Sequence, residues 1–220
     1  SGDNPNMDFL KLNFNYGIVR FSSIFASTVG YMQENRDDRY TKYFSAHRIK
    51  VAIPDIVDLA ISDVVIYNGR IEFAYLNPIL LWHFAEKSLQ DRDNKNFILD
   101  FKTKFIKNVE FQGTLFVDDD EQFAIFSGGT TRSQKYVYQF GTMIYEPLIK
   151  NLSLTVEYTK IRPFTYTHYD IRDNYTAYGA NLGHRIGPNA DELFSRITYN
   201  ISNWGRINLE YSHVRKGNNI

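Results

Sequence analysis

The 220-residue sequence contains no cysteine, two tryptophans and six prolines. The absence of cysteine excludes disulfide frameworks, thiolate metal sites and cysteine nucleophiles. Positive and negative side chains are balanced at 25 each, so charge gives no reason to expect a nucleic-acid partner. No apolar run approaches the roughly 18–20 residues of a membrane-spanning helix. A soluble β-protein and a membrane β-barrel both remain open, because alternating strands give a barrel the average composition of a soluble protein.

Aromatic residues are abundant, at 16% of the chain, with 16 Tyr and 17 Phe. Apolar and polar residues also alternate with a period of two along most of the chain, which predicts strands. Gly17 falls within the first of these segments and is expected to be a bend. We therefore expect an all-β fold of about nine antiparallel strands, each of roughly ten residues. The segments are 10–25, 44–53, 56–66, 97–105, 109–117, 136–144, 152–159, 193–201 and 207–211.

One segment predicts a short helix. Asn77 suits the N-cap, Pro78 suits the first helical position, and residues 79–84 form an apolar stretch.

The predicted connections alternate between short and long. The short ones are 54–55, 107–108, 146–150 and 202–205, and the long ones are 33–42, 68–95, 118–133 and 162–190. If consecutive strands are antiparallel neighbours, all short turns lie at one end of the sheet and all long loops at the other, as in outer-membrane barrels. A soluble β-sandwich shows the same alternation of residues but does not need to sort its loops. We favour a single unit over residues 1–220, an antiparallel up-and-down transmembrane β-barrel or a segment of one.

The predicted strand count is odd, whereas bacterial single-chain barrels have an even number of strands. An unclosed sheet in lipid would leave unpaired backbone groups, each costing several kcal/mol. We therefore expect the strands that complete the barrel to come from sequence outside this chain or from another chain.

The 162–190 loop is the richest in groups that suit sugars. Tyrosine rings can stack on the C–H faces of a sugar, while Asp, Asn, Arg and His hold its hydroxyls. In the alternative interpretation, these side chains bond one another and hold the loop folded into the barrel mouth. The candidate glycan-binding residues are Arg162, Tyr166, His168, Asp170, Asp173, Asn174, Tyr175, Tyr178 and His184.

Other polar clusters carry weaker signals. Asp91, Arg92, Asp93 and Asn94 form a second polar cluster, which suits a solvated turn of paired charges. The acidic run at 118–121 offers carboxylate oxygens for a hard cation, but its spacing matches no EF-hand loop, so a solvated acidic loop is favoured. The five histidines show no metal-ligand spacing, and no nucleophile elbow, P-loop or dinucleotide fingerprint occurs. We expect no enzyme activity, no metal and no cofactor.

Several stretches of the sequence resemble the capsule-assembly Wzi-like family, in the form found in Bacteroidetes and related bacteria. The resemblance covers about residues 40–217 and is carried by 42–49, 62–70, 71–78, 91–94 and 162–193. Its most specific parts are 165–170 (TYTHYD), 173–179 (DNYTAYG), 182–184 (LGH) and 187–193 (GPNADEL). The resemblance implies a large, lipid-embedded outer-membrane β-barrel of a Gram-negative bacterium that binds capsular or extracellular polysaccharide like a lectin, without enzymatic activity. It also implies that this chain is an internal segment of a longer barrel. The unclosed sheet makes the missing part of the same chain, or other outer-membrane proteins, the expected partners.

The leading hypothesis is thus a non-enzymatic outer-membrane barrel that holds a surface glycan at its loop end. One alternative is a porin-like channel for small solutes, whose lumen the same loops constrict. A second alternative is a secreted glycan-active enzyme on a soluble β-scaffold.

Overall fold

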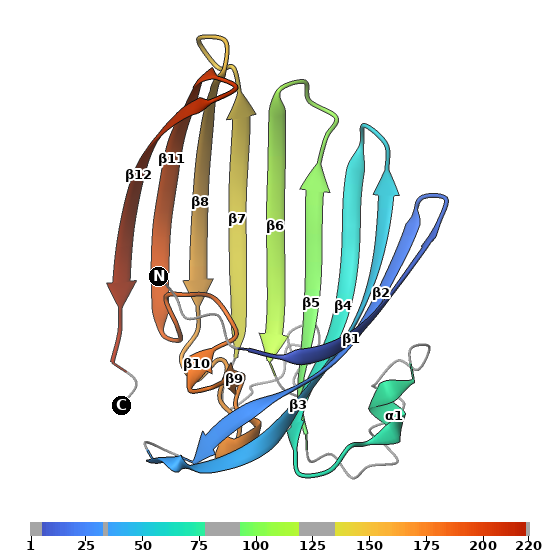
Figure 1. Ribbon diagram of the computed structural model, residues 1–220. Coiled ribbons are helices and arrows are strands. Elements are labelled where there is room, and N and C mark those ends of the chain that lie inside the picture. The colour runs from blue at the N-terminus through green and yellow to red at the C-terminus, as the bar shows by residue number, and fades with distance from the viewer. Residues whose placement is uncertain (1–5, 33–34, 78–92, 119–134, 219–220) are drawn as a thin grey trace, which may run out of the picture.

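A single large antiparallel sheet dominates the protein (Figure 1). The computed structural model describes residues 6–32, 35–77, 93–118 and 135–218. Ten strands follow one another in chain order across the sheet, which confirms the predicted all-β, up-and-down antiparallel arrangement. They are β1 (Asp8–Tyr16), β2 (Val19–Met32), β3 (Asn35–Ile53), β4 (Val57–Asn68), β5 (Asn94–Thr103), β6 (Val109–Asp118), β7 (Tyr136–Tyr145), β8 (Leu152–Ile161), β11 (Ala190–Ser202) and β12 (Gly205–Lys216). The shorter elements are α1 (Phe73–Leu76), the 3-10 turn η2 (Ile171–Asp173), and the paired β9 (Thr176–Ala177) and β10 (Ala180–Asn181).

The expected count of nine strands is wrong because the first predicted segment is a hairpin. Tyr16 pairs with Val19, so Gly17 and Ile18 form a two-residue turn between β1 and β2. Gly17 has a positive φ of 57°, which glycine adopts without steric cost. The sheet therefore has an even number of strands, and the argument for missing strands from an odd count no longer holds.

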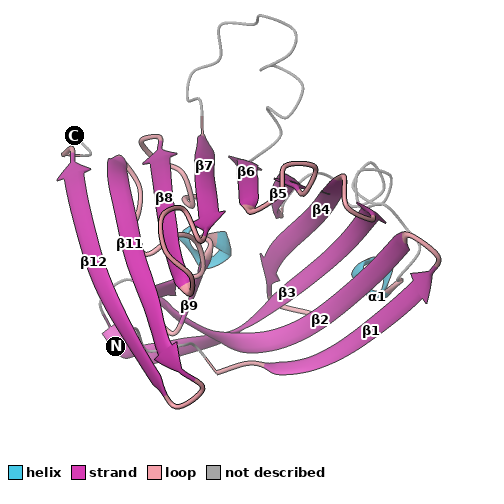
Figure 2. Ribbon diagram, turned by 90° about the horizontal axis from the view of Figure 1, so that it is seen from above, coloured by secondary structure: helices cyan, strands magenta, loops and turns pink. Residues whose placement is uncertain are grey.

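The sheet is curved but open, and the described strands do not close into a barrel by themselves (Figure 2). β1 and β12 are the two edge strands, and among the described residues they do not pair with each other. A sheet becomes a barrel only when its two edge strands hydrogen-bond to each other.

The described short turns of the sheet all lie at one of its ends. Short turns join β1 to β2, β3 to β4, β5 to β6, β7 to β8 and β11 to β12 at the upper end of Figure 1. At the other end, here called the long-loop end, β4, β6 and β8 end and β5, β7 and β11 begin. The predicted loop 33–42 is wrong, because β2 runs to Met32 and β3 begins at Asn35. The β2–β3 hairpin extends beyond the end of β4. The β3–β4 pairing stops at Lys42, whereas β2 and β3 are still paired at Gly30 and Tyr40.

No described residue tests the helix predicted to follow Asn77. The helix α1 ends there, and the backbone N–H of Asn77 donates to the carbonyl oxygen of Ala74, at 3.4 Å. Residues 79–84 of the predicted helix lie outside the described residues. Among the residues described, no helix has the length and apolar character needed to cross a membrane.

The two faces of the sheet differ in chemistry because successive side chains point to opposite sides. The convex face carries exposed apolar residues, such as Phe14, Leu59, Phe140 and Leu209. The concave face carries charged pairs, which include Lys50–Asp58 at 2.7 Å, Lys102–Glu110 at 2.8 Å and Arg196–Glu210 at 2.8 Å. The main buried core also lies on the concave side, at the long-loop end.

Candidate functional site

Residues 162–189 fold back against the concave face at the long-loop end (Figure 2). Tyr166, Tyr175 and Ile186 of this segment are buried in one core with Phe116 of β6 and Ile66 of β4. The Phe116 ring centroid lies 5.3 Å from that of Tyr166 and 5.5 Å from that of Tyr175, both edge-on. Burying an aromatic side chain contributes about 1.5–3 kcal/mol, so these rings fix the segment onto the sheet.

The backbone of this segment closes tightly around the Tyr166 ring. Tyr166 itself has a positive φ of 75°. Its carbonyl oxygen accepts from the N–H of Tyr175 at 3.0 Å, and the carbonyl oxygen of Tyr175 accepts from the N–H of Leu182, also at 3.0 Å. A Cβ at Gly183 would lie 2.3 Å from the Tyr166 ring, so only glycine allows this approach.

A buried polar cluster joins the segment to the ends of the strands. The Asp173 side chain is 3% exposed, and its Oδ1 accepts from Nδ2 of Asn68 at 2.8 Å. Nδ2 of Asn94 donates to the carbonyl oxygen of Asp173 at 2.9 Å, and Nζ of Lys42 donates to the carbonyl oxygen of Asn174. Burial raises the pKa of Asp173 to about 6, while the hydrogen bond from Asn68 opposes the shift.

The outward side of the segment presents exposed polar and aromatic groups. Tyr169 is 79% exposed, and its ring lies 4.1 Å from that of His168. Asp170 and Arg172 form a salt bridge in which Nη2 of Arg172 lies 2.6 Å from Oδ2 of Asp170. This contact holds the pKa of Asp170 below its usual range. Both residues are therefore charged at neutral pH and ready to hold hydroxyl or carboxylate groups.

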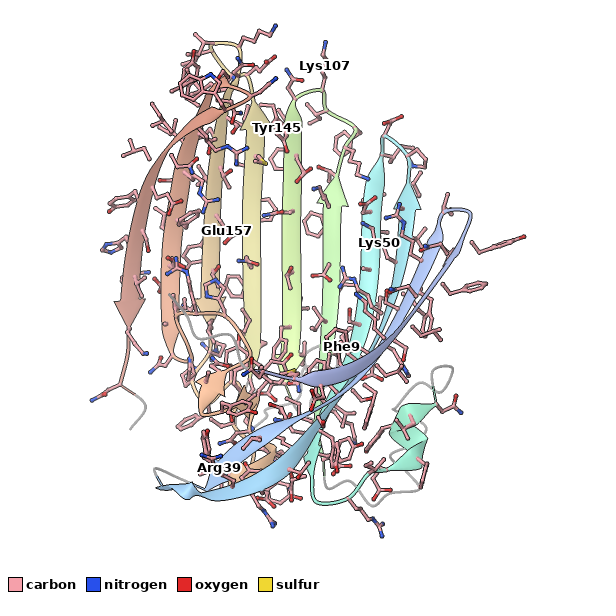
Figure 3. The ribbon with its side chains drawn as sticks, viewed as in Figure 1. Phe9, Arg39, Lys50, Lys107, Tyr145 and Glu157 are labelled. Atoms are coloured by element: carbon pink, nitrogen blue, oxygen red, sulfur yellow. The ribbon has the colours of Figure 1, made fainter. Side chains whose placement is uncertain are left out.

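The extended β2–β3 hairpin meets this side of the segment. The Tyr40 hydroxyl donates to the carbonyl oxygen of Arg172 at 3.0 Å. The N–H of Tyr178 donates to the carbonyl oxygen of Val29 at 2.8 Å, and the Tyr31 and Tyr178 rings meet edge-on at 6.1 Å. We call the resulting set the loop-end surface: Tyr31, Tyr40, Tyr169, Asp170, Arg172 and Tyr178. It lies at the same end of the molecule as Arg39, and Tyr145 lies at the opposite end (Figure 3).

The structure brings together only some of the residues predicted from the sequence to bind glycan. His168, Asp170 and Tyr178 lie at or beside the loop-end surface, while Tyr166, Asp173 and Tyr175 are buried supports. Asn174 is half-buried, and its Oδ1 accepts from the N–H of His168 at 2.7 Å.

The remaining two members of that set lie elsewhere. Arg162 stacks over the ring of Tyr136 at 5.5 Å. The N–H of His184 donates to the hydroxyl of Tyr166 at 3.2 Å, and burial lowers the pKa of its imidazole. Neither side chain faces the loop-end surface.

The described residues of the second predicted polar cluster, Asp93 and Asn94, form hydrogen bonds within the fold. Oδ2 of Asp93 accepts from the hydroxyl of Tyr75 at 2.6 Å, and Asn94 is buried against the segment. Asp91 and Arg92 lie outside the described residues. The described part of the chain holds no group of three His, Asp or Glu side chains placed to bind a metal ion.

Sequence reasoning missed Tyr31 and Tyr40. Both belong to the hairpin that was taken for a loop from residue 33, so no contact with the distant segment was expected. The available signal was the spacing of tyrosines on either side of the turn, which suits two paired strands.

Comparison with known families gives one match: residues 22–219 match the capsule assembly protein Wzi family. Searches of curated proteins and of solved structures found no match. The matched range includes strands from both halves of the sheet and the whole 162–189 segment. Membership implies a Gram-negative outer-membrane protein that takes part in attaching capsular polysaccharide and is generally non-enzymatic. The chain belongs to the capsule assembly protein Wzi family.

Proposed function

We propose that this protein holds capsular polysaccharide at the cell surface through its loop-end surface and does not cleave it. The observation that carries the proposal is that the docked segment presents exposed tyrosines and a bidentate Asp–Arg pair at one end of the sheet. A membrane-embedded sheet with an apolar convex face would aim this end away from the lipid.

The chemistry of the loop-end surface suits a glycan. Tyr169 and Tyr178 are 79% and 38% exposed, so their ring faces are available to the C–H faces of sugar rings. Nε of Arg172 donates to both carboxylate oxygens of Asp170, at 3.0 and 3.1 Å. A sugar hydroxyl can therefore accept from the guanidinium and donate to the carboxylate at one place.

The orientation follows from the sorting of connections and faces. Outer-membrane strands place tight turns on the periplasmic side and long loops outside the cell. The exposed convex side chains, such as Leu59 (47%) and Phe140 (53%), would meet hydrocarbon. The backbone edges of β1 and β12 would then require partner strands, from a longer chain or from a second protein, because unpaired groups in lipid cost several kcal/mol each.

A channel for small solutes is the second candidate function, and the polar concave face favours it. Conductance across a planar bilayer would support a channel, and its absence in a protein that binds glycan would support the holding role.

The test of glycan binding compares a double tyrosine variant at the loop-end surface with a single tyrosine variant at the opposite end of the sheet. We expect the double variant Tyr169→Ala and Tyr178→Ala to bind capsular polysaccharide more weakly, by roughly 1 kcal/mol for each lost ring. The control is Tyr145→Ala, which removes a 42% exposed tyrosine at the opposite end. Binding is measured on cells and with purified glycan, and heat-modifiable migration in gels monitors folding. If the folded double variant holds capsule as tightly as the unchanged protein, the proposed site is wrong.

A further inference from the structure

A hollow of about 300 Å³ lies where β8 and β12 end and β11 begins, and no residue of the loop-end surface lines it. Four basic residues line it, and Asp191 is the single carboxylate-bearing residue among the lining residues. The basic residues are Lys160, Arg162, Arg215 and Lys216.

The charges at this hollow are arranged in a row across three strands. Asp191 pairs with Lys160 on one side and with Arg215 on the other, so the three side chains share one face of the sheet. Nε of Arg215 donates to Oδ1 of Asp191 at 2.8 Å, and Nη2 donates to Oδ2 at 3.0 Å. The Arg215 side chain remains 68% exposed, and the row of Lys160, Asp191 and Arg215 carries two positive charges and one negative charge.

This row lies on the apolar, convex face, just beyond its tyrosines. Tyr158 and Leu193 pair with each other on the same face, two positions away from Lys160 along β8 and from Asp191 along β11. Tyr158 continues into a line of rings, with Tyr138 at 6.2 Å and Tyr136 a further 6.3 Å away. Tyrosine is enriched where lipid meets water, so the hollow lies at headgroup level if the convex face meets lipid.

From this position we infer that the hollow binds the phosphate of an outer-leaflet lipid headgroup. Guanidinium and ammonium groups on one side of a shallow hollow match a phosphate, which accepts several charge-assisted hydrogen bonds. The inference rests on the membrane orientation given above but not on the glycan surface. It assigns β8, β11 and β12 a role in fixing the protein's depth in the membrane.

The test is binding of phosphatidic acid to the full chain in phosphatidylcholine–detergent micelles, measured by native mass spectrometry. We expect the unchanged protein to retain phosphatidic acid in preference to phosphatidylcholine. The double variant Lys160→Gln and Arg215→Gln should bind it about 25-fold more weakly, because each basic side chain near an anionic surface contributes about fivefold. Lys160→Gln alone, which leaves the Arg215–Asp191 contact in place, should lose about fivefold.

The control is Arg196→Gln, which breaks the Arg196–Glu210 pair on the concave face. It removes one positive charge, as Lys160→Gln does, and should leave phosphatidic acid binding unchanged. Equal binding by the double variant, or an equal loss in Arg196→Gln, would overturn the inference. So would displacement of phosphatidic acid by inorganic phosphate at equal concentration, because the hollow would then serve soluble phosphate. Retention of capsular glycan by the double variant separates this result from the test of the loop-end surface.

Discussion

Asp173 should make the docking of the 162–189 segment depend on pH, and Asp173→Asn should remove that dependence. The carboxyl group is 3% exposed, and burial raises its pKa to about 6 in the folded protein, from 3.8 in the unfolded chain. The folded state therefore favours the protonated form. The protonated Asp173 carboxyl group makes its full contribution to stability below about pH 4, and this contribution is lost as the pH rises through about 6.

The size of the effect follows from the shift. Raising the pKa of Asp173 from 3.8 to about 6 corresponds to at most about 3 kcal/mol of stability, and screening by nearby water reduces this to about 1–2 kcal/mol. The shift already includes the opposing attraction of Lys42. In Asp173→Asn, the amide oxygen still accepts from Asn68 and the buried carboxylate charge is removed, while the buried ammonium of Lys42 remains. We expect the variant to dock more tightly than the unchanged protein at pH 7, by about the same 1–2 kcal/mol.

The assay is hydrogen exchange of the Tyr175 and Leu182 amides, which bond within the segment. Exchange is measured in detergent from pH 4 to 7 and corrected for the intrinsic rate. Asp170→Asn is the control, because Arg172 holds the pKa of Asp170 low and that group stays charged through most of this range. If Asp173→Asn keeps the pH dependence of the unchanged protein, Asp173 does not titrate as the structure indicates.

Two further predictions concern packing and the lipid-facing side. Gly183→Ala should destabilise the docked segment by about 1–3 kcal/mol, because its Cβ would lie 2.3 Å from the Tyr166 ring; Gly205→Ala, with no atom nearer than 3.7 Å, should have little effect. Protease cleavage within 162–189 measures the difference, and equal cleavage of the two variants would contradict it. Phe140→Arg on the convex face should reduce folding into vesicles by about 2–4 kcal/mol, whereas Gln139→Arg on the concave face should be tolerated. The folded fraction on gels measures both, and equal folding would contradict a lipid-facing convex side.

The strands could be predicted from the sequence because a half-buried sheet imposes a period of two on each strand. The β1–β2 hairpin also leaves a signal in the sequence. The outward apolar residues are even-numbered at Leu12, Phe14 and Tyr16 but odd-numbered at Val19 and Phe21. A regular strand keeps its parity, so this switch indicates a bulge or a turn, and the structure shows the two-residue turn of Gly17 and Ile18.

The candidate site was harder to predict because its tyrosines look alike in the sequence. Tyr166 and Tyr175 are buried because Phe116, on a distant strand, lies against both rings. Tyr169 and Tyr178 lie close to them in the chain yet remain exposed. Spacing within a loop does not specify which side chains face the sheet, since the loop has no regular period.

If the loop-end surface binds glycan as proposed, the buried tyrosines preorganise the 162–189 segment and the exposed ones contact the ligand. Ordering a long segment at the moment of ligand binding would consume much of the interaction energy. The core around Tyr166 orders the segment beforehand, so Tyr169 and Tyr178 are already in place when a glycan arrives. Gly183→Ala should therefore weaken glycan binding although it contacts no exposed tyrosine. The loss should follow the loosening of the segment seen by protease cleavage, and a loosened segment that binds glycan at full strength would show that preorganisation plays no part.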